Sequence, residues 1–170
     1  MIFRSLEPIS EFEKLRNEIF EIVNRVGFED NQVILQSLTD NEEWHTGVGA
    51  LEELEEKDEL KYAIINHSIE HTEIAKIIQK YQGFRARIMR MDSRRCYSVH
   101  KDPTARIHIP IETNDQCWMV WPYNNLCASM PTGNIYFVDT TKSHTFLNAG
   151  LDPRIHLMFC VSKFPKLSNI

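Results

Sequence analysis

Two segments in the first half of the chain carry apolar residues at helical spacing. The first covers residues 8–26 and is followed by Gly27, and the second covers residues 68–81 and is followed by Gly83. The apolar positions are Phe12, Leu15, Ile19, Ile22, Val23 and Val26 in the first segment, and Ile69, Ile74, Ile77, Ile78 and Tyr81 in the second. We therefore expect two amphipathic helices, each with one buried face.

After Gly83 the pattern changes to short segments that are rich in β-branched and aromatic residues. Clusters of Pro, Gly, Asn and Asp separate them and indicate turns. The predicted strands are 85–91, 96–100, 106–113, 117–121, 134–138, 145–148 and 154–162, and residues 31–38 favour a further strand in the first half. Helices followed by closely spaced strands predict an α+β fold with a sandwich or small barrel.

Two of the predicted strands alternate between apolar and polar positions. Where the strand begins at Arg106, isoleucines occupy one face, and Arg106 and His108 occupy the other. Where the strand begins at Arg154, Arg154 and His156 likewise lie opposite an apolar face. If the helices cover the apolar faces, the polar faces point into a barrel, where a guanidinium needs a partner. This favours an interior pocket for an anion over an open sheet with a solvated polar side.

Composition and charge narrow the class of protein. The chain has 170 residues, of which 42% are hydrophobic and 25% are charged, as in a soluble globular domain. We expect one domain over residues 1–170, with a mainly helical part at 1–83 and a strand-rich core with the site at 84–162. The net charge of −5 gives no reason to expect nucleic acid or an anionic membrane as a partner. Without a signal peptide or spanning segment, a cytoplasmic location is expected.

The candidate chemistry begins at His100 and Asp102. They lie two positions apart at the end of a predicted strand, so their side chains point to the same side. Together with His144 they supply two histidines and one carboxylate, the ligand set of non-haem Fe(II) oxygenases. Arg154 follows on the neighbouring predicted strand, where its guanidinium can pair with a carboxylate of a metal-bound acid.

These segments together resemble the aspartyl/asparaginyl β-hydroxylases, a family of Fe(II)- and 2-oxoglutarate-dependent dioxygenases. The resemblance covers residues 84–162 and is carried by residues 97–102, 106–114, 138–150 and 153–157. It implies a double-stranded β-helix (jelly-roll) fold with N-terminal helices packed on one sheet. It also implies Fe(II) ligands at His100, Asp102 and His144, a 2-oxoglutarate clamp at Arg154, and further co-substrate contacts at Arg106, His108 and Ser98.

The resemblance further implies the reaction. The chain would use O2 to hydroxylate an unactivated C–H bond of an amino acid, either a small molecule or a residue in a peptide, and release succinate and CO2. In having a carboxylate at Asp102, the chain resembles the small bacterial branch of the family, which includes free-proline hydroxylases. The membrane-anchored animal enzymes and the halogenating relatives lack this carboxylate. Asn148 and Trp118 are candidate substrate contacts, although Asn148 fits a strand-end turn equally well and Trp118 fits the core.

Two other functions fit parts of the sequence. His67, Glu70 and His71 match the inverted zinc-protease signature H-x-x-E-H. That site needs a further acidic ligand from a downstream helix, whereas the downstream half predicts strands, so a polar helix terminus fits better. The other alternative is a jelly-roll binding module without iron, which leaves the complete set of histidines, aspartate and arginine unexplained.

Two segments between the predicted helices lack a clear pattern. Residues 44–50 form a glycine-punctuated loop with an aromatic residue and a histidine, which suits either a lid over a pocket or a surface turn. Residues 51–60 are strongly acidic and predict a solvated segment without chemistry of its own.

Overall fold

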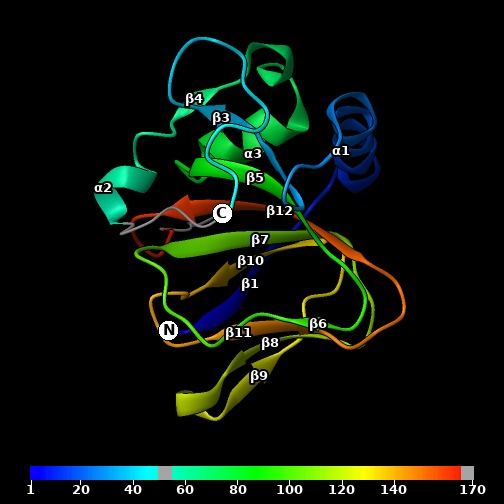
Figure 1. Ribbon diagram of the computed structural model, residues 1–170, viewed down its shortest axis with the longest axis vertical. Helices are drawn as coiled ribbons and strands as arrows, with labels where there is room; N and C mark the ends of the chain where they lie inside the picture. Colours follow the sequence, from blue (N-terminus) through cyan, green and yellow to red (C-terminus); the bar gives the residue numbers. More distant parts are fainter. Residues whose placement is uncertain (50–54, 166–170) are drawn as a thin grey trace.

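The computed structural model describes residues 1–49 and 55–165 (Figure 1). Its helical elements are α1 (Phe12–Val26), α2 (Glu56–Glu59), α3 (Glu73–Lys80) and the short 3-10 turns η1 (His67–Ile69) and η2 (Pro122–Asn124). Its strands are β1 (Phe3–Pro8), β2 (Gln32–Ile34), β3 (Gln36–Ser37), β4 (Ile64–Ile65), β5 (Phe84–Met91), β6 (Arg95–Cys96), β7 (Ala105–Glu112), β8 (Cys117–Trp121), β9 (Leu126–Ala128), β10 (Asn134–Val138), β11 (Thr145–Asn148) and β12 (Arg154–Val161).

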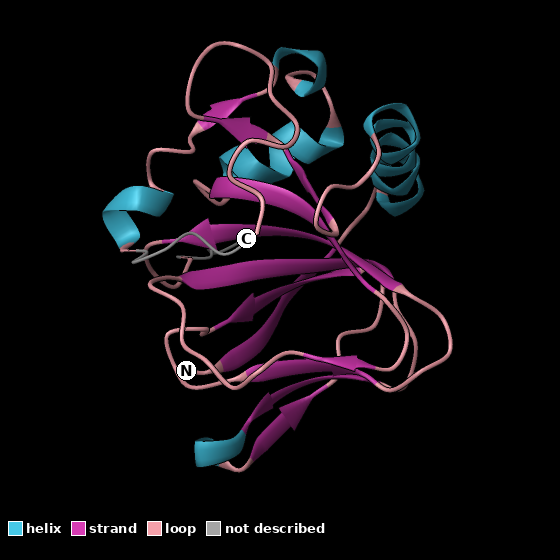
Figure 2. Ribbon diagram, viewed as in Figure 1, coloured by secondary structure: helices cyan, strands magenta, loops and turns pink. Residues whose placement is uncertain are grey.

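Antiparallel sheets dominate the fold, and the helices are few. A six-stranded sheet has the order β1-β10-β7-β12-β5-β2, a four-stranded sheet has the order β6-β11-β8-β9, and β3 pairs with β4. The two larger sheets face each other, and α1 and α3 lie on the far side of the six-stranded sheet (Figure 2). No helix in the described part of the chain is long and apolar enough to cross a membrane.

The outer face of the six-stranded sheet builds the main core with the two helices. Ile107 and Leu157 of the sheet are completely buried in one cluster with Leu15 and Ile19 of α1 and Ile74 of α3. Complete burial of each such side chain stabilises the fold by about 1.5–3 kcal/mol. The predicted apolar faces of β7 and β12, and the helices as their cover, are therefore confirmed.

The inner face carries the polar residues that the alternation predicted. On β12, Met158 lies opposite Arg87 of β5 on one side and opposite His108 of β7 on the other, and Cys160 lies opposite Arg106. These side chains point toward the four-stranded sheet, since the intervening residues belong to the outer core. The space between the sheets is thus lined by cations and imidazoles.

The first half of the chain departs from the predicted order of elements. Residues 3–8 form an edge strand, so the first helix begins at Phe12 and not at residue 8. The predicted strand at 31–38 is divided at Leu35, where β2 joins the six-stranded sheet and β3 leaves it for β4. Strands interleaved with the helices correct the expected α+β arrangement of N-terminal helices followed by strands.

The acidic segment also differs from its prediction. Residues 51–54 lie outside the described residues, and Glu55, Glu56 and Lys57 are exposed as expected. Glu59 is fully buried, however, because its carboxylate pairs with Arg85 at 2.9 Å. The expectation of a wholly solvated segment is therefore wrong at this position.

Candidate active site

Two histidines and an aspartate meet at the open end of the space between the sheets. His100 and His144 lie opposite each other in an isolated antiparallel bridge, with N–O distances of 3.0 and 2.9 Å. The backbone N–H of Asp102 donates to the carbonyl of Thr140 at 2.9 Å. One potential ligand atom from each of His100, Asp102 and His144 lies within 4.8 Å of the others. The backbone thus brings together a metal-ligand set from two distant segments.

Both histidine rings present the same nitrogen to this meeting point. The Nδ1 atoms of His100 and His144 lie 2.7 and 2.9 Å from the carbonyls of Ser98 and Lys142. A carbonyl only accepts, so each Nδ1 carries the proton and each Nε2 keeps its lone pair. Burial lowers the pKa of His144, which favours its neutral form. Both imidazoles are therefore prepared as metal ligands.

Asp102 completes the set with one engaged and one free oxygen. Its Oδ1 forms an ion pair with Arg106, at 2.7 Å from Nη2. Its Oδ2 lies 3.5 Å from His144 Nε2 and has no hydrogen-bond partner among the described residues. A buried carboxylate oxygen without a partner is costly, and a divalent cation would satisfy it. Two imidazoles, one carboxylate and open positions suit Fe(II).

Arg154 carries a second group of buried polar atoms without a hydrogen-bond partner among the described residues. This residue is 2% exposed, and its Nε and Nη1 have no hydrogen-bond partner among the described residues. Its guanidinium lies 3.9 Å from the centre of the Phe146 ring. Burial lowers the pKa of Arg154 to about 10, because desolvation opposes its charge. A carboxylate ligand would supply the missing partner in a planar, two-point pair.

His108 and His156 lie next to this arginine on the inner face. Their Nδ1 atoms are 3.4 Å apart, and the Nε2 of each lacks a partner among the described residues. Burial lowers the pKa of both well below 6.5, and the charge of Arg154 lowers it further. Both rings are therefore neutral near pH 7, and together with Arg154 they can hydrogen-bond an oxygen-rich acid.

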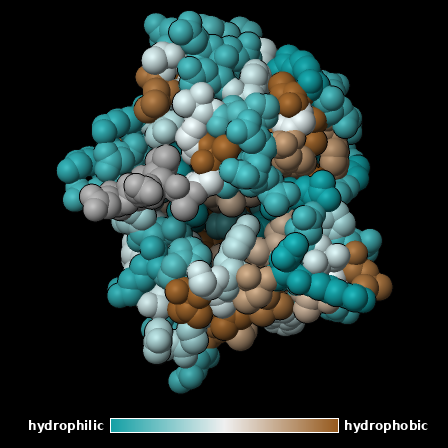
Figure 3. Space-filling view, in the orientation of Figure 1, coloured by the Kyte–Doolittle hydropathy of each residue, from teal (hydrophilic) through white to brown (hydrophobic). Residues whose placement is uncertain are grey.

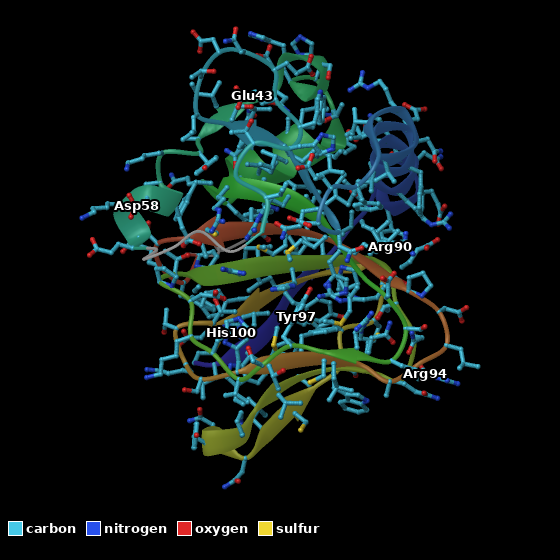
Figure 4. All side chains as sticks on the ribbon, viewed as in Figure 1. Glu43, Asp58, Arg90, Arg94, Tyr97 and His100 are labelled. Atoms are coloured by element: carbon cyan, nitrogen blue, oxygen red, sulfur yellow. The ribbon has the colours of Figure 1, made fainter. Side chains whose placement is uncertain are left out.

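A cavity of about 460 Å³ opens beside the three potential ligands. His100, Asp102 and Arg106 form one part of its lining, and Arg87 and Tyr97 belong to the rest. Tyr97 and His100 lie on the segment that continues β6 alongside β11 at the edge of the four-stranded sheet (Figure 4), next to a hollow of the surface between the two sheets (Figure 3). Arg87 is 3% exposed, and its Nη1 donates to Gln32 Oε1 at 2.7 Å. A ligand in this cavity would touch both the metal-ligand set and a buried cation.

Comparison with known proteins assigns the family. The model of the aspartyl/asparaginyl beta-hydroxylase family matches residues 10–163. The chain belongs to this family. It is therefore a 2-oxoglutarate-dependent dioxygenase with Fe(II) and 2-oxoglutarate as cofactors, as the resemblance in the sequence implied.

The fold of this family member agrees with one solved structure. The viral collagen prolyl hydroxylase of Paramecium bursaria Chlorella virus-1, solved as a 2OG complex, is 12% identical, with a TM-score of 0.56. The alignment covers 95% of this chain and 97% of the viral chain. No curated protein matches the chain by sequence.

The secondary contacts predicted for this dioxygenase lie in different places. His108 contacts His156, whereas Arg106 pairs with Asp102 on the side of the cavity. The side chain of Ser98 is exposed, and only its carbonyl is shown in contact with His100. The co-substrate roles of these three residues stay predictions.

Of the two candidate substrate contacts, Asn148 has a structural task, and Trp118 is exposed and does not belong to the core as its alternative predicted. The Asn148 side-chain amide donates to the carbonyls of Met91, Asp92 and Asp152 at 3.4, 3.2 and 2.8 Å, which agrees with its alternative as a turn residue. Trp118 is 38% exposed and lines a separate hollow with Met130. Their contact with substrate stays a prediction without support from these distances.

The protease signature lies on the surface. His67 and His71 are exposed near η1, and His67 Nδ1 lies 2.9 Å from Glu70 Oε1. In the described part of the chain, the group of His, Cys, Asp and Glu that can hold a metal is His100, Asp102 and His144. The segment therefore fits the polar helix terminus that we favoured.

The loop that follows β3 reaches toward the cavity at one point. Trp44 packs under the Arg25 guanidinium at 4.9 Å, and His45 Nε2 lies 3.1 Å from the carbonyl of Gly27. Gly49 lines the cavity. Residue 50 lies outside the described residues, and the lid function of 44–50 stays a prediction.

Sequence reasoning missed Arg87, Gln32 and Glu59. Arg87 shares strand parity with Met89 and Met91, so the alternation along 84–91 could have placed it on the inner face. Gln32 and Glu59 carry no comparable signal, because each meets its partner only through the folded sheet.

Proposed function

We propose that this dioxygenase hydroxylates an unactivated C–H bond of an amino acid, either free or in a peptide. His100, Asp102 and His144 would hold Fe(II), and Arg154 would hold the remote carboxylate of 2-oxoglutarate. The observation that carries the proposal is the unpartnered Asp102 Oδ2 beside two histidine Nε2 lone pairs, at the wall of a cavity. Two facing antiparallel sheets support a jelly roll in a single domain as the scaffold.

The residues around the proposed metal site have different roles. Bound Fe(II) and 2-oxoglutarate supply the oxidising chemistry with O2, and succinate and CO2 are the expected co-products. The backbone carbonyls of Ser98 and Lys142 hold the two imidazoles in the ligating tautomer. Arg106 holds Asp102 through Oδ1 and leaves Oδ2 for the metal. His108 and His156 are both neutral and share a hydrogen bond between their Nδ1 atoms, so the ring that accepts at Nδ1 carries its proton on Nε2 and would donate it to the co-substrate.

Arg87 supports an amino acid as the substrate class. It is a buried guanidinium in the cavity wall, and its hydrogen bond to Gln32 leaves Nε without a partner among the described residues. The α-carboxylate of an amino acid, or a side-chain carboxylate, would form a charge-assisted pair there. Met89 and Tyr97 supply apolar surface for the rest of the molecule.

The test is a turnover screen on anaerobically loaded protein. Fe(II) and 2-oxoglutarate are added, O2 is admitted, and succinate is measured with free amino acids and short peptides. Hydroxylated product is detected as the mass gain of one oxygen atom. His144→Ala and Asp102→Ala should lose bound iron and turnover, whereas His71→Ala, an exposed histidine, should keep both. Full iron binding and turnover in His144→Ala would overturn the assignment.

A further inference from the structure

A buried carboxylate from α2 lies behind the metal-ligand set. The Oε1 of Glu59 lies 2.9 Å from Arg85 Nη1 and 3.6 Å from Arg106 Nη2. Its Oε2 accepts from the Thr104 hydroxyl at 2.5 Å. Glu59 is completely buried, whereas its helix neighbour Glu56 is exposed. The helix thus delivers one acidic side chain to a place where charge is expensive.

Arg106 connects this carboxylate to the metal-ligand set. The same nitrogen, Nη2, lies 2.7 Å from Asp102 Oδ1 and 3.6 Å from Glu59 Oε1. Arg106 is therefore shared between a carboxylate that would ligate the metal and one that would not. The position of the guanidinium decides which oxygen of Asp102 remains free, and Glu59 fixes that position from the other side.

Thr104 fixes Glu59 to the same loop. Its hydroxyl donates to Glu59 Oε2, and its carbonyl accepts from the Thr140 hydroxyl at 2.6 Å. The carbonyl of Thr140 in turn accepts from the backbone N–H of Asp102 at 2.9 Å. Glu59 is therefore held by a residue that is itself tied to the backbone beside Asp102.

The balance of charges around Glu59 predicts how its replacement would change the affinity of the site for a metal. The carboxylates of Glu59 and Asp102 share the guanidiniums of Arg85 and Arg106, and Arg87 adds a further cation nearby. Without the charge of Glu59, Arg106 would pair with Asp102 alone and compete more strongly for the carboxylate that the metal needs.

We propose that Glu59 is a positioning residue for the metal centre, acting through Arg106 on Asp102. The proposal rests on the proposed function, since it requires the metal at His100, Asp102 and His144. The competing explanation is that Glu59 only neutralises Arg85 and stabilises the fold. The two explanations differ in what happens to metal affinity, and in whether the effect of Glu59 depends on Arg106.

The first experiment measures binding of Mn(II), a redox-stable probe, by calorimetry. Outer partners of metal ligands typically change metal affinity by about 10- to 100-fold, and Glu59→Gln should weaken Mn(II) binding within that range. Glu56→Gln makes the same chemical change at an exposed position of the helix and should leave affinity unchanged. Thermal unfolding of the metal-free variants shows whether each is folded. Parent-like affinity in folded Glu59→Gln would overturn the proposal.

The second experiment is a double-mutant cycle with Arg106→Gln. If Glu59 acts through Arg106, Glu59→Gln should have little further effect on Mn(II) affinity once Arg106 is replaced. An equal loss in both backgrounds would show that Arg106 is not the route and would overturn the proposal. Should Glu59→Gln not fold, Thr104→Val carries the test, because it removes the hydrogen bond to Glu59 and keeps the charge. Thr104→Val should weaken Mn(II) binding less than the roughly 10- to 100-fold expected for Glu59→Gln. An affinity equal to that of the parent would count against the proposal.

The parent protein and His144→Ala separate this inference from the function beneath it. If the parent does not bind Mn(II), or His144→Ala binds it equally well, the metal site itself is wrong. If the parent binds Mn(II) and His144→Ala does not, the metal site stands. An unaffected Glu59→Gln then refutes only the role of Glu59.

Discussion

Two buried arginines lie at different points of the same inner face, and their surroundings differ. Arg154 of β12 lies opposite Met91, and Arg87 of β5 lies opposite Met158, so four strand positions separate them, roughly 13 Å. Neither forms an ion pair within 4.0 Å among the described residues. Burial is the first cause that lowers the pKa of each, to about 10 for Arg154 and about 9 for Arg87.

The neighbours of the two arginines suggest two kinds of ligand. Arg154 lies against the Phe146 ring and two neutral histidines, a fixed and largely uncharged environment that suits one constant ligand. Arg87 lines an open cavity, and the charges of Arg106 and Arg85 lower its pKa further. The first environment suits the co-substrate that the family shares, and the second suits a substrate that can differ between family members.

The largest expected effect follows from replacement of Arg154. Arg154→Lys keeps a cation but loses the planar two-point pair, and the loss of a buried charge-assisted pair costs on the order of 2–5 kcal/mol. That corresponds to roughly 30- to several-thousand-fold weaker 2-oxoglutarate binding. The dissociation constant for 2-oxoglutarate is measured anaerobically by calorimetry, with Mn(II) affinity as the internal control. Unchanged 2-oxoglutarate binding would move the clamp elsewhere, with Arg106 as the next candidate.

Replacement of Arg87 should give the opposite profile. Arg87→Met removes the cation from the cavity wall and keeps much of its volume, so a substrate carboxylate would lose a charged hydrogen bond worth about 1.5–3 kcal/mol. The KM for the amino-acid substrate should rise by about 10- to 100-fold, while 2-oxoglutarate affinity stays close to that of the parent. If Arg87→Met instead weakens 2-oxoglutarate and spares the substrate, the two arginines have exchanged roles.

The neutral histidines near Arg154 predict a pH dependence of stability. The pKa of His108 and of His156 lies well below 6.5 in the folded protein, whereas in the unfolded chain it is close to 6.5. Below pH 6.5 the unfolded chain binds more protons, so the stability of the metal-free protein falls as the pH falls. Each histidine contributes up to about 1.4 kcal/mol per pH unit. Urea unfolding at several pH values should show a shallower slope of stability against pH for His156→Gln than for the parent, and an equal slope in the two proteins would contradict this prediction.

The smallest expected effect tests the surface histidines. His67→Ala and His71→Ala lie outside both arginine environments, and His67 is held only by an exposed pair with Glu70. Surface pairs of this kind contribute about 0–1 kcal/mol, so metal content and turnover should match the parent. Loss of bound zinc together with peptidase activity in either variant would instead revive the protease signature.

The two environments also show what the sequence can reveal. Arg154 and His156 could be placed because strand alternation is local and the opposite face is apolar, and the same reasoning placed His108. His100 and Asp102 lie two positions apart, so their shared direction could be inferred in the same way. The structure brings His100 and Asp102 together with His144, as the sequence suggested.

The missed residues depend on contacts between distant segments. Arg87 meets Gln32, and Arg85 meets Glu59, only after β2 and α2 have packed against β5. The stretch around Glu59 is almost entirely charged, so nothing in its pattern distinguishes the buried glutamate from its exposed neighbours. The edge strand at residues 3–8 was missed for a similar reason, since mixed burial along it gives no strict alternation.

The bridge between His100 and His144 has a consequence for how a bound metal would affect unfolding of the protein. The two residues are 44 positions apart in the sequence (144 − 100), yet their backbones bond directly to each other. A metal ion bound to both rings would hold the two ends of this long loop together. The conformational entropy that the chain regains when the loop opens would then be available only after the metal has dissociated. Only the closed loop offers all the ligands, so metal should slow unfolding and protect the segments on both sides of the bridge from amide hydrogen exchange.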